Sequence, residues 1–152
     1  MNFWNEILGN RVLVCAVMGW TVAQVLKTII DFCLNRSFNP ERLFGSGGMP
    51  SSHTSMVVAA SIMLGALNGF DSAVFAAAVV FSSVVMYDAT GVRRETGRQA
   101  VVINRILQDV LINGRPISNV ELKELVGHKP IEVAAGALLG VAIAVVYLLI
   151  LF

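Results

Sequence analysis

The chain has 152 residues, of which 56% are hydrophobic and only 14% are charged, and its formal net charge is +1. Soluble domains carry about 25% charged residues, so the composition favours an integral membrane protein, and the length favours a single membrane-embedded domain over residues 1–152. The near-neutral charge argues against a nucleic-acid partner, because it provides no basic field for a phosphate backbone.

Four apolar stretches are predicted to be helices that cross the membrane: residues 12–32, 54–67, 73–87 and 131–152. The first and the last reach the roughly 20 residues that a span needs. The middle two are shorter, but Asp71 is the only charged residue from Thr54 to Tyr87. We therefore expect these two stretches to form a helical hairpin that crosses the bilayer and returns.

Two further helices are expected in the long connection at 88–130. Apolar residues recur there at helical spacing, from Ile103 to Leu111, and predict an amphipathic helix at about 98–112. Ser118 and Glu121 form a capping box that predicts a short helix ending at Gly127. The expected fold is thus an all-α membrane bundle of about four transmembrane helices with these two additions.

Alternation of the four spans places the connections 33–53 and 88–130 on one membrane face and both termini on the other. The first face then carries both histidines and, on or beside it, every lysine and arginine except Arg11. Cytoplasmic loops are enriched in basic residues. The charge bias therefore predicts a multi-pass protein of the plasma membrane whose histidine-bearing face is cytoplasmic.

The first polar motif on that face is the run 47–53, in which two glycines precede Pro50, Ser51, Ser52 and His53. Pro and Ser open a helix whose N-terminal N–H groups favour an anion, and a histidine in that turn can exchange a proton near neutral pH. The run suits a phosphate cradle with an acid attached. It equally suits an ordinary loop with a serine N-cap.

Two more polar motifs lie at the ends of the third and fourth spans. Asp88 is followed by Arg93 and Arg94, which suit bidentate phosphate binding or a positive-inside flank in contact with lipid headgroups. His128 precedes Glu132 by one helical turn, so the carboxylate could orient the imidazole and raise its nucleophilicity. The alternative is a helix-entry acid favoured by the dipole beside an interfacial histidine.

A polar stripe also crosses the first span, where Gln24, Lys27, Thr28 and Asp31 recur at i, i+3, i+4 and i+7. We expect it to point into the bundle near the same face. Lys27 could bind a phosphate there, pair with Asp31, or extend along the helix to the membrane surface.

Three stretches of the chain resemble the signatures of a known family. They are Gly-Gly-Met-Pro-Ser-Ser-His-Thr-Ser at 47–55, Met-Tyr-Asp-Ala-Thr-Gly-Val-Arg-Arg at 86–94 and Glu-Leu-Val-Gly-His-Lys-Pro-Ile-Glu-Val at 124–133. As a set they are similar to the divergent branch of the type 2 phosphatidic-acid phosphatases, within the acid phosphatase and vanadium haloperoxidase superfamily. The chain departs from the superfamily pattern at Ser52, where glycine is usual, and at Glu132, where aspartate is usual. Arg94 and His128 are also far apart in the chain.

The resemblance implies a membrane phosphatase that hydrolyses a phosphomonoester or diphosphate of a lipid through a phosphohistidine, without a metal or other cofactor. His128 would be the nucleophile, Glu132 would orient it, and His53 would act as acid and base. The implied phosphate-binding residues are Lys27, Arg42, Ser51, Ser52, Arg93 and Arg94, with Asp88 and Gln24 as additional site residues. The substrate would be a lipid phosphate that enters from the bilayer, with membrane lipids around it.

Two rival functions stay open at this point. One is a metal-dependent membrane enzyme or ion-binding protein that uses His53, Asp88, His128 and Glu132. The other is a non-catalytic bundle that binds or transports lipids on the same fold. The sequence also leaves open whether the chain forms a homo-oligomer.

Overall fold

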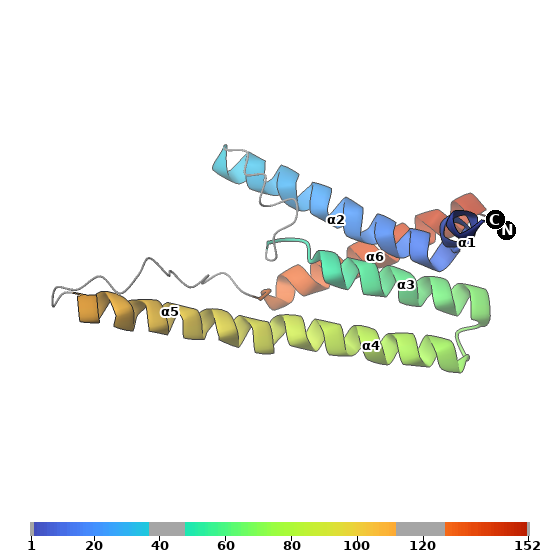
Figure 1. The fold of residues 1–152 in the computed structure, drawn as a ribbon. Coiled ribbons are helices and arrows are strands. Elements are labelled where there is room, and N and C mark those ends of the chain that lie inside the picture. The colour runs from blue at the N-terminus through green and yellow to red at the C-terminus, as the bar shows by residue number, and fades with distance from the viewer. Residues whose placement is uncertain (1, 37–47, 112–126, 152) are drawn as a thin grey trace.

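The computed structural model describes residues 2–36, 48–111 and 127–151, and the regular elements in these ranges are α-helices (Figure 1). In chain order they are α1 (Phe3–Gly9), α2 (Arg11–Asn35), α3 (Ser52–Asn68), α4 (Ala73–Thr90), α5 (Val92–Leu111) and α6 (Pro130–Leu151). The prediction of an all-α membrane protein is confirmed.

Three stretches are long and apolar enough to cross a membrane: Arg11–Asn35, Ala73–Asn104 and Pro130–Leu151. The second of these joins α4 to the first part of α5. α3 has 17 residues, which is the lower end of the roughly 17–25 residues of a transmembrane helix. It corresponds to the predicted span at 54–67, and it is the shortest of the four main helices.

Side-chain caps fix where α2, α3 and α4 begin. The Asn10 side chain accepts the N–H of Leu13 at 3.1 Å, Ser51 Oγ accepts the N–H of Thr54 at 3.4 Å, and Ser72 Oγ accepts the N–H of Phe75 at 3.2 Å. Such caps satisfy N–H groups that the first helical turn leaves unpaired. Between α3 and α4, Gly69 adopts a φ of 93°, a left-handed conformation that glycine reaches without strain. The predicted tight hairpin forms at this point.

α3 lies at the centre of the bundle and packs against α2, α4 and α6. The fully buried core is built mostly from small side chains, with Cys15, Ala59 and Ala144 around Met63. The outer surface is apolar: Phe81 on α4 is 62% exposed and Leu138 on α6 is 73% exposed. A bundle with a small-residue interior and an apolar exterior is suited to a lipid environment.

α2 and α4 end at the same end of the bundle at which α3 and α6 begin (Figure 1). We call this the site end. Both termini of the chain lie at the opposite end (Figure 1). The alternating arrangement of helices inferred from the sequence is therefore the arrangement of the structure.

The predicted amphipathic helix is present as α5, but it begins at Val92, earlier than expected, and nearly continues the axis of α4 beyond the site end (Figure 1). Gly91 separates the two helices, and its N–H still donates to the carbonyl of Tyr87 at 2.8 Å. The predicted short helix falls almost wholly in residues 112–126, outside the described ranges. Gly127, its expected end, has a φ of 95°.

Candidate active site

His128 is held between the end of α4 and the start of α6. Its backbone N–H donates to the carbonyl of Ala89 at 2.9 Å, and its Nδ1 lies 2.9 Å from Oε2 of Glu132. The side chain of His128 is only 5% exposed. In a neutral imidazole, a hydrogen bond to the carboxylate places the proton on Nδ1 and leaves the lone pair on Nε2. The imidazole is thus oriented as a nucleophile or base requires.

Glu132 links the histidine to the rest of the site end. Its Oε2 also accepts the backbone N–H of Lys129 at 3.2 Å, and its backbone carbonyl accepts the N–H of Ser51 at 3.0 Å. The second bond joins the first turn of α6 to the residue that caps α3. One residue therefore orients His128 and fixes the position of α3 beside it.

Ser51 and Ser52 are both buried at the start of α3. Ser51 Oγ accepts the N–H of Thr54 at 3.4 Å and the hydroxyl of Thr54 at 3.0 Å. The N–H and the oxygen of Ser51 are thus engaged in structural bonds, and Ser52 is the first residue of the helix proper. His53, in the same turn, is exposed.

Lys27 and Gln24 are buried, at 2% and 5% exposure, and Lys27 Nζ donates to Gln24 Oε1 at 2.8 Å. Ser55 Oγ donates to the carbonyl of Gly19 at 3.0 Å, which sets the register of the antiparallel helices α2 and α3. Lys27 lies two turns beyond Gly19 along α2, and Ser51 lies one turn before Ser55 along α3. Lys27 is therefore at the site end, about one turn beyond the level where α3 begins.

The other members of the polar stripe are less buried. Thr28 is half-buried and donates its hydroxyl to the carbonyl of Gln24 at 2.9 Å, and Asp31 is half-buried and accepts from the Asn35 amide at 3.0 Å. The stripe points inward at Gln24 and Lys27 and approaches the surface toward the end of α2.

The bond between His128 and Ala89 also accounts for the long separation in sequence between Arg94 and His128. Ala89 is in the last turn of α4, next to the half-buried Asp88, and Arg93 and Arg94 follow in the first turn of α5. The backbone that carries the two arginines therefore starts beside the histidine. Arg42 lies outside the described ranges.

The residues proposed for a metal site do not form one. Among the residues that the structure describes, no three histidine, cysteine, aspartate or glutamate side chains are grouped closely enough to hold a metal ion. His53, Asp88, His128 and Glu132 are all described. The pairing of Glu132 is instead with the imidazole of His128.

Sequence reasoning missed the glycines that bring the two histidine-bearing segments together. A Cβ on Gly136 would lie 2.5 Å from the carbonyl oxygen of Ser51, and one on Gly140 would lie 2.6 Å from that of Ser55. The spacing Gly-x-x-x-Gly is a known sign of close helix contact in membranes. It is visible in the chain and could have predicted that α6 packs directly on another helix.

These features define an α-helical membrane protein with a carboxylate-oriented histidine at one end of its bundle. The chain belongs to the divergent PAP2 family, whose model matches residues 8–143. It is 38% identical over 151 residues to a Bacillus subtilis (strain 168) protein called uncharacterized membrane protein YuiD, covering 93% of this chain and 96% of that one. No solved structure matches the chain.

Proposed function

We propose that the protein is a membrane phosphatase that removes the phosphate of a lipid phosphomonoester or diphosphate through a phosphohistidine on His128. The observation that carries the proposal is the 2.9 Å contact between His128 Nδ1 and Glu132 Oε2. It leaves Nε2 as the atom with a lone pair, on a buried side chain at the end of the bundle that also holds a buried lysine. Family membership supports the same reaction class.

In the first step, His128 Nε2 attacks the terminal phosphorus, a P–N bond forms, and the P–O bond to the leaving group breaks. His53 protonates the departing oxygen, so that a lipid alcohol leaves from a monophosphate and a lipid monophosphate leaves from a diphosphate. The positive charge that develops on the imidazole is stabilised by the Glu132 carboxylate. In the second step, His53 takes a proton from water, the water oxygen attacks phosphorus, the P–N bond breaks, and inorganic phosphate is released.

Negative charge on the phosphoryl oxygens requires fixed donors during both steps. Lys27 provides a buried ammonium positioned by Gln24. The first turn of α3, from Ser52, presents N–H groups that a helix cannot pair internally. Arg93, Arg94 and Arg42 are assigned to the same role, in which a guanidinium binds phosphate through two parallel hydrogen bonds.

The first test is phosphate release from a panel of lipid phosphates by the purified protein in detergent with EDTA, comparing wild type with Glu132→Gln. Wild type is expected to release phosphate. Glu132→Gln should lower the rate roughly 10²- to 10⁴-fold, because a neutral amide cannot stabilise the charged imidazole.

Glu6→Gln is the matched control, since Glu6 is an exposed residue of α1 at the opposite end of the bundle. Its rate should equal that of wild type. Absence of hydrolysis by wild type across the panel would refute the phosphatase proposal and favour a non-catalytic lipid-binding bundle. A Glu132→Gln rate equal to wild type would refute the role of the His128–Glu132 pair.

The membrane orientation is a separate prediction, based on the bias of basic residues toward the site end. In a Cys15→Ala, Cys33→Ser background, single cysteines replace Lys129, exposed at the site end, or Asp71, exposed at the opposite end. In intact cells, a membrane-impermeant thiol reagent should label the cysteine at 71 and spare the cysteine at 129 until the cells are opened. The reverse pattern would place the site end outside.

A further inference from the structure

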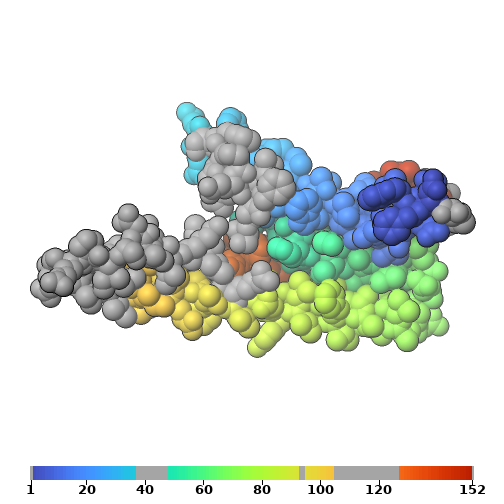
Figure 2. Space-filling model, viewed as in Figure 1, coloured from blue at the N-terminus to red at the C-terminus, as the bar shows by residue number. Residues whose placement is uncertain are grey.

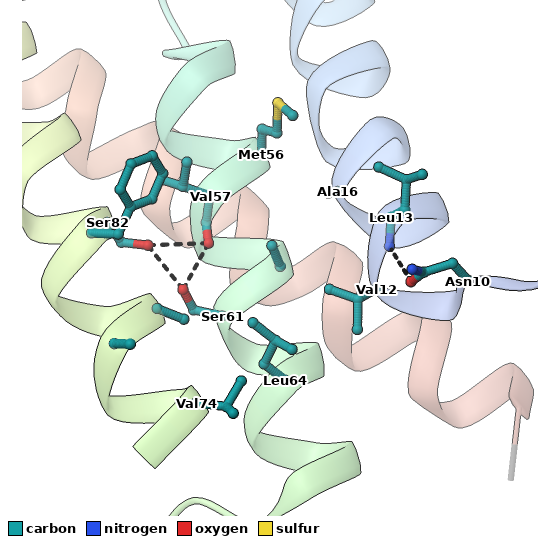
Figure 3. Close-up of a pocket in the computed structure, with 14 residues that line it drawn as sticks. Asn10, Val12, Leu13, Ala16, Met56, Val57, Ser61, Leu64, Val74 and Ser82 are labelled. Atoms are coloured by element: carbon teal, nitrogen blue, oxygen red, sulfur yellow. Dashed lines mark hydrogen bonds between the residues drawn. The ribbon is translucent and has the colours of Figure 1, made fainter. Parts of the chain in front are cut away.

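A groove of about 640 Å³ runs along the bundle between α2 and α4, with α3 as its floor (Figure 3). Its volume is in the range of roughly 300–1,000 Å³ found for ligand pockets. The lining is almost entirely apolar, with Leu13 from α2, Ala60 and Leu64 from α3, and Ala77 and Phe81 from α4. Figure 2 shows the same arrangement from outside, with the atoms of α3 visible between those of α2 and α4.

The polar side chains of the groove already have hydrogen-bond partners: Asn10 accepts the N–H of Leu13, and the two serines pair with each other. The hydroxyls of Ser61 and Ser82 lie 2.9 Å apart, and both lie within hydrogen-bond distance of the Val57 carbonyl, at 2.8 and 3.2 Å (Figure 3). These bonds join α3 to α4 and occupy the serine hydroxyls, so a polar ligand would find few hydrogen-bond partners in the groove. The groove therefore suits a hydrocarbon chain.

The α3 residues that form the floor of the groove lie on the same face of the helix as His53. Side chains three, four, seven and eleven residues apart share one face of a helix, so His53, Met56, Val57, Ala60 and Leu64 line up along α3. The last four line the groove. His53 is exposed, although it lies in the first turn of α3, the helix at the centre of the bundle.

The length of this face matches that of a lipid chain, and the groove continues toward the end of the bundle opposite the site end, where α2 and α4 begin. Eleven residues separate His53 from Leu64, which is roughly 16 Å along a helix. The hydrocarbon core of a bilayer is about 30 Å thick, so a lipid whose phosphate lies at His53 has chains that extend about half that distance. The groove wall is also open to lipid, since Val74 and Phe81 are 50% and 62% exposed.

We propose that the groove between α2 and α4 holds a hydrocarbon chain of the lipid phosphate whose headgroup is processed at His53 and His128. The inference rests on the proposed function and specifies its substrate class: a phosphate ester of a long-chain lipid, bound lengthwise along α3. Short, water-soluble phosphate esters reach the same headgroup site without this contribution to binding.

The test compares kcat/KM for a long-chain alkyl phosphate and a short, water-soluble alkyl phosphate in Ala77→Phe and Ala76→Phe. Ala77 lines the groove, whereas its exposed neighbour Ala76 does not. In Ala77→Phe the ratio of long-chain to short-chain kcat/KM should fall roughly tenfold, as expected for displacing about two methylenes. In Ala76→Phe the ratio should stay at the wild-type value.

An unchanged ratio in Ala77→Phe would overturn the groove assignment while leaving the phosphatase proposal standing.

If wild type hydrolyses neither substrate, the phosphatase proposal fails. The groove is then tested by photolabelling with a long-chain alkyl phosphate that carries a diazirine near mid-chain. Label on α3 and α4 that falls in Ala77→Phe supports the groove. The groove assignment is overturned if the lipid-facing α6 is labelled as strongly as α3 and α4, or if labelling is the same in Ala77→Phe as in wild type.

Discussion

Replacing His128 with asparagine is expected to abolish hydrolysis, with a loss of at least about 10³-fold, because the substitution removes the atom that attacks phosphorus. Asparagine is chosen over alanine for a structural reason. Its side-chain NH₂ can still donate to Glu132, so the largely buried carboxylate keeps a partner. Alanine would leave that carboxylate with only the backbone N–H of Lys129 as a partner, and the loss of the second hydrogen bond would cost about 1–3 kcal/mol of stability.

His53→Asn is the informative companion variant. His53 is on α3, is exposed, and is assigned to proton transfer, so its loss should slow turnover by roughly 10²- to 10⁴-fold. A substrate with a good leaving group and a labelled phosphate should still transfer the label to the protein in His53→Asn, but not in His128→Asn. Label on the protein in His128→Asn, or turnover near the wild-type rate, would end the phosphohistidine mechanism. A shared thermal midpoint for the two variants would show that folding does not explain the difference.

The helices could be predicted because each rests on local chemistry. Long apolar runs predicted α2 and α6, and the near absence of charge around Asp71 predicted the α3–α4 hairpin. The pairing of His128 with Glu132 followed from residues one turn apart in one segment. The buried positions of Gln24 and Lys27 followed from helical spacing. All of these are relations within a single element, where spacing alone fixes which side chains are neighbours.

The contacts that assemble the site end could not be predicted in the same way. They are backbone bonds between segments distant in the chain, from His128 to Ala89 and from Ser51 to Glu132. Backbone groups are the same in every residue, so no side-chain pattern marks them. The early start of α5 was also missed, because the apolar pattern that predicted this helix begins only at Ile103, whereas the structure resumes a helix immediately after Gly91.

The second large effect is expected at the contact between α3 and α6. Gly136→Ala and Gly140→Ala each place a methyl group about where backbone atoms of α3 now lie, 2.5 Å from Ser51 O and 2.6 Å from Ser55 O respectively. Backbone cannot yield as a flexible side chain can, so the helices must separate. Each substitution should destabilise the bundle by about 1–3 kcal/mol, and the double variant by more than either. Thermal unfolding in detergent, followed by circular dichroism, measures the effect.

Gly9→Ala is the matched control, because a Cβ at Gly9 meets no atom within 4 Å, and its midpoint should equal or slightly exceed that of wild type. A double variant that unfolds at the wild-type temperature would contradict the close contact.

The two single variants also separate stability from catalysis. Gly136 lies against Ser51, whose N–H bonds to the Glu132 carbonyl, whereas Gly140 is one turn further from the site. At equal loss of stability, Gly136→Ala should therefore lower phosphate release more than Gly140→Ala, because it displaces α3 where α3 meets the residue that orients His128.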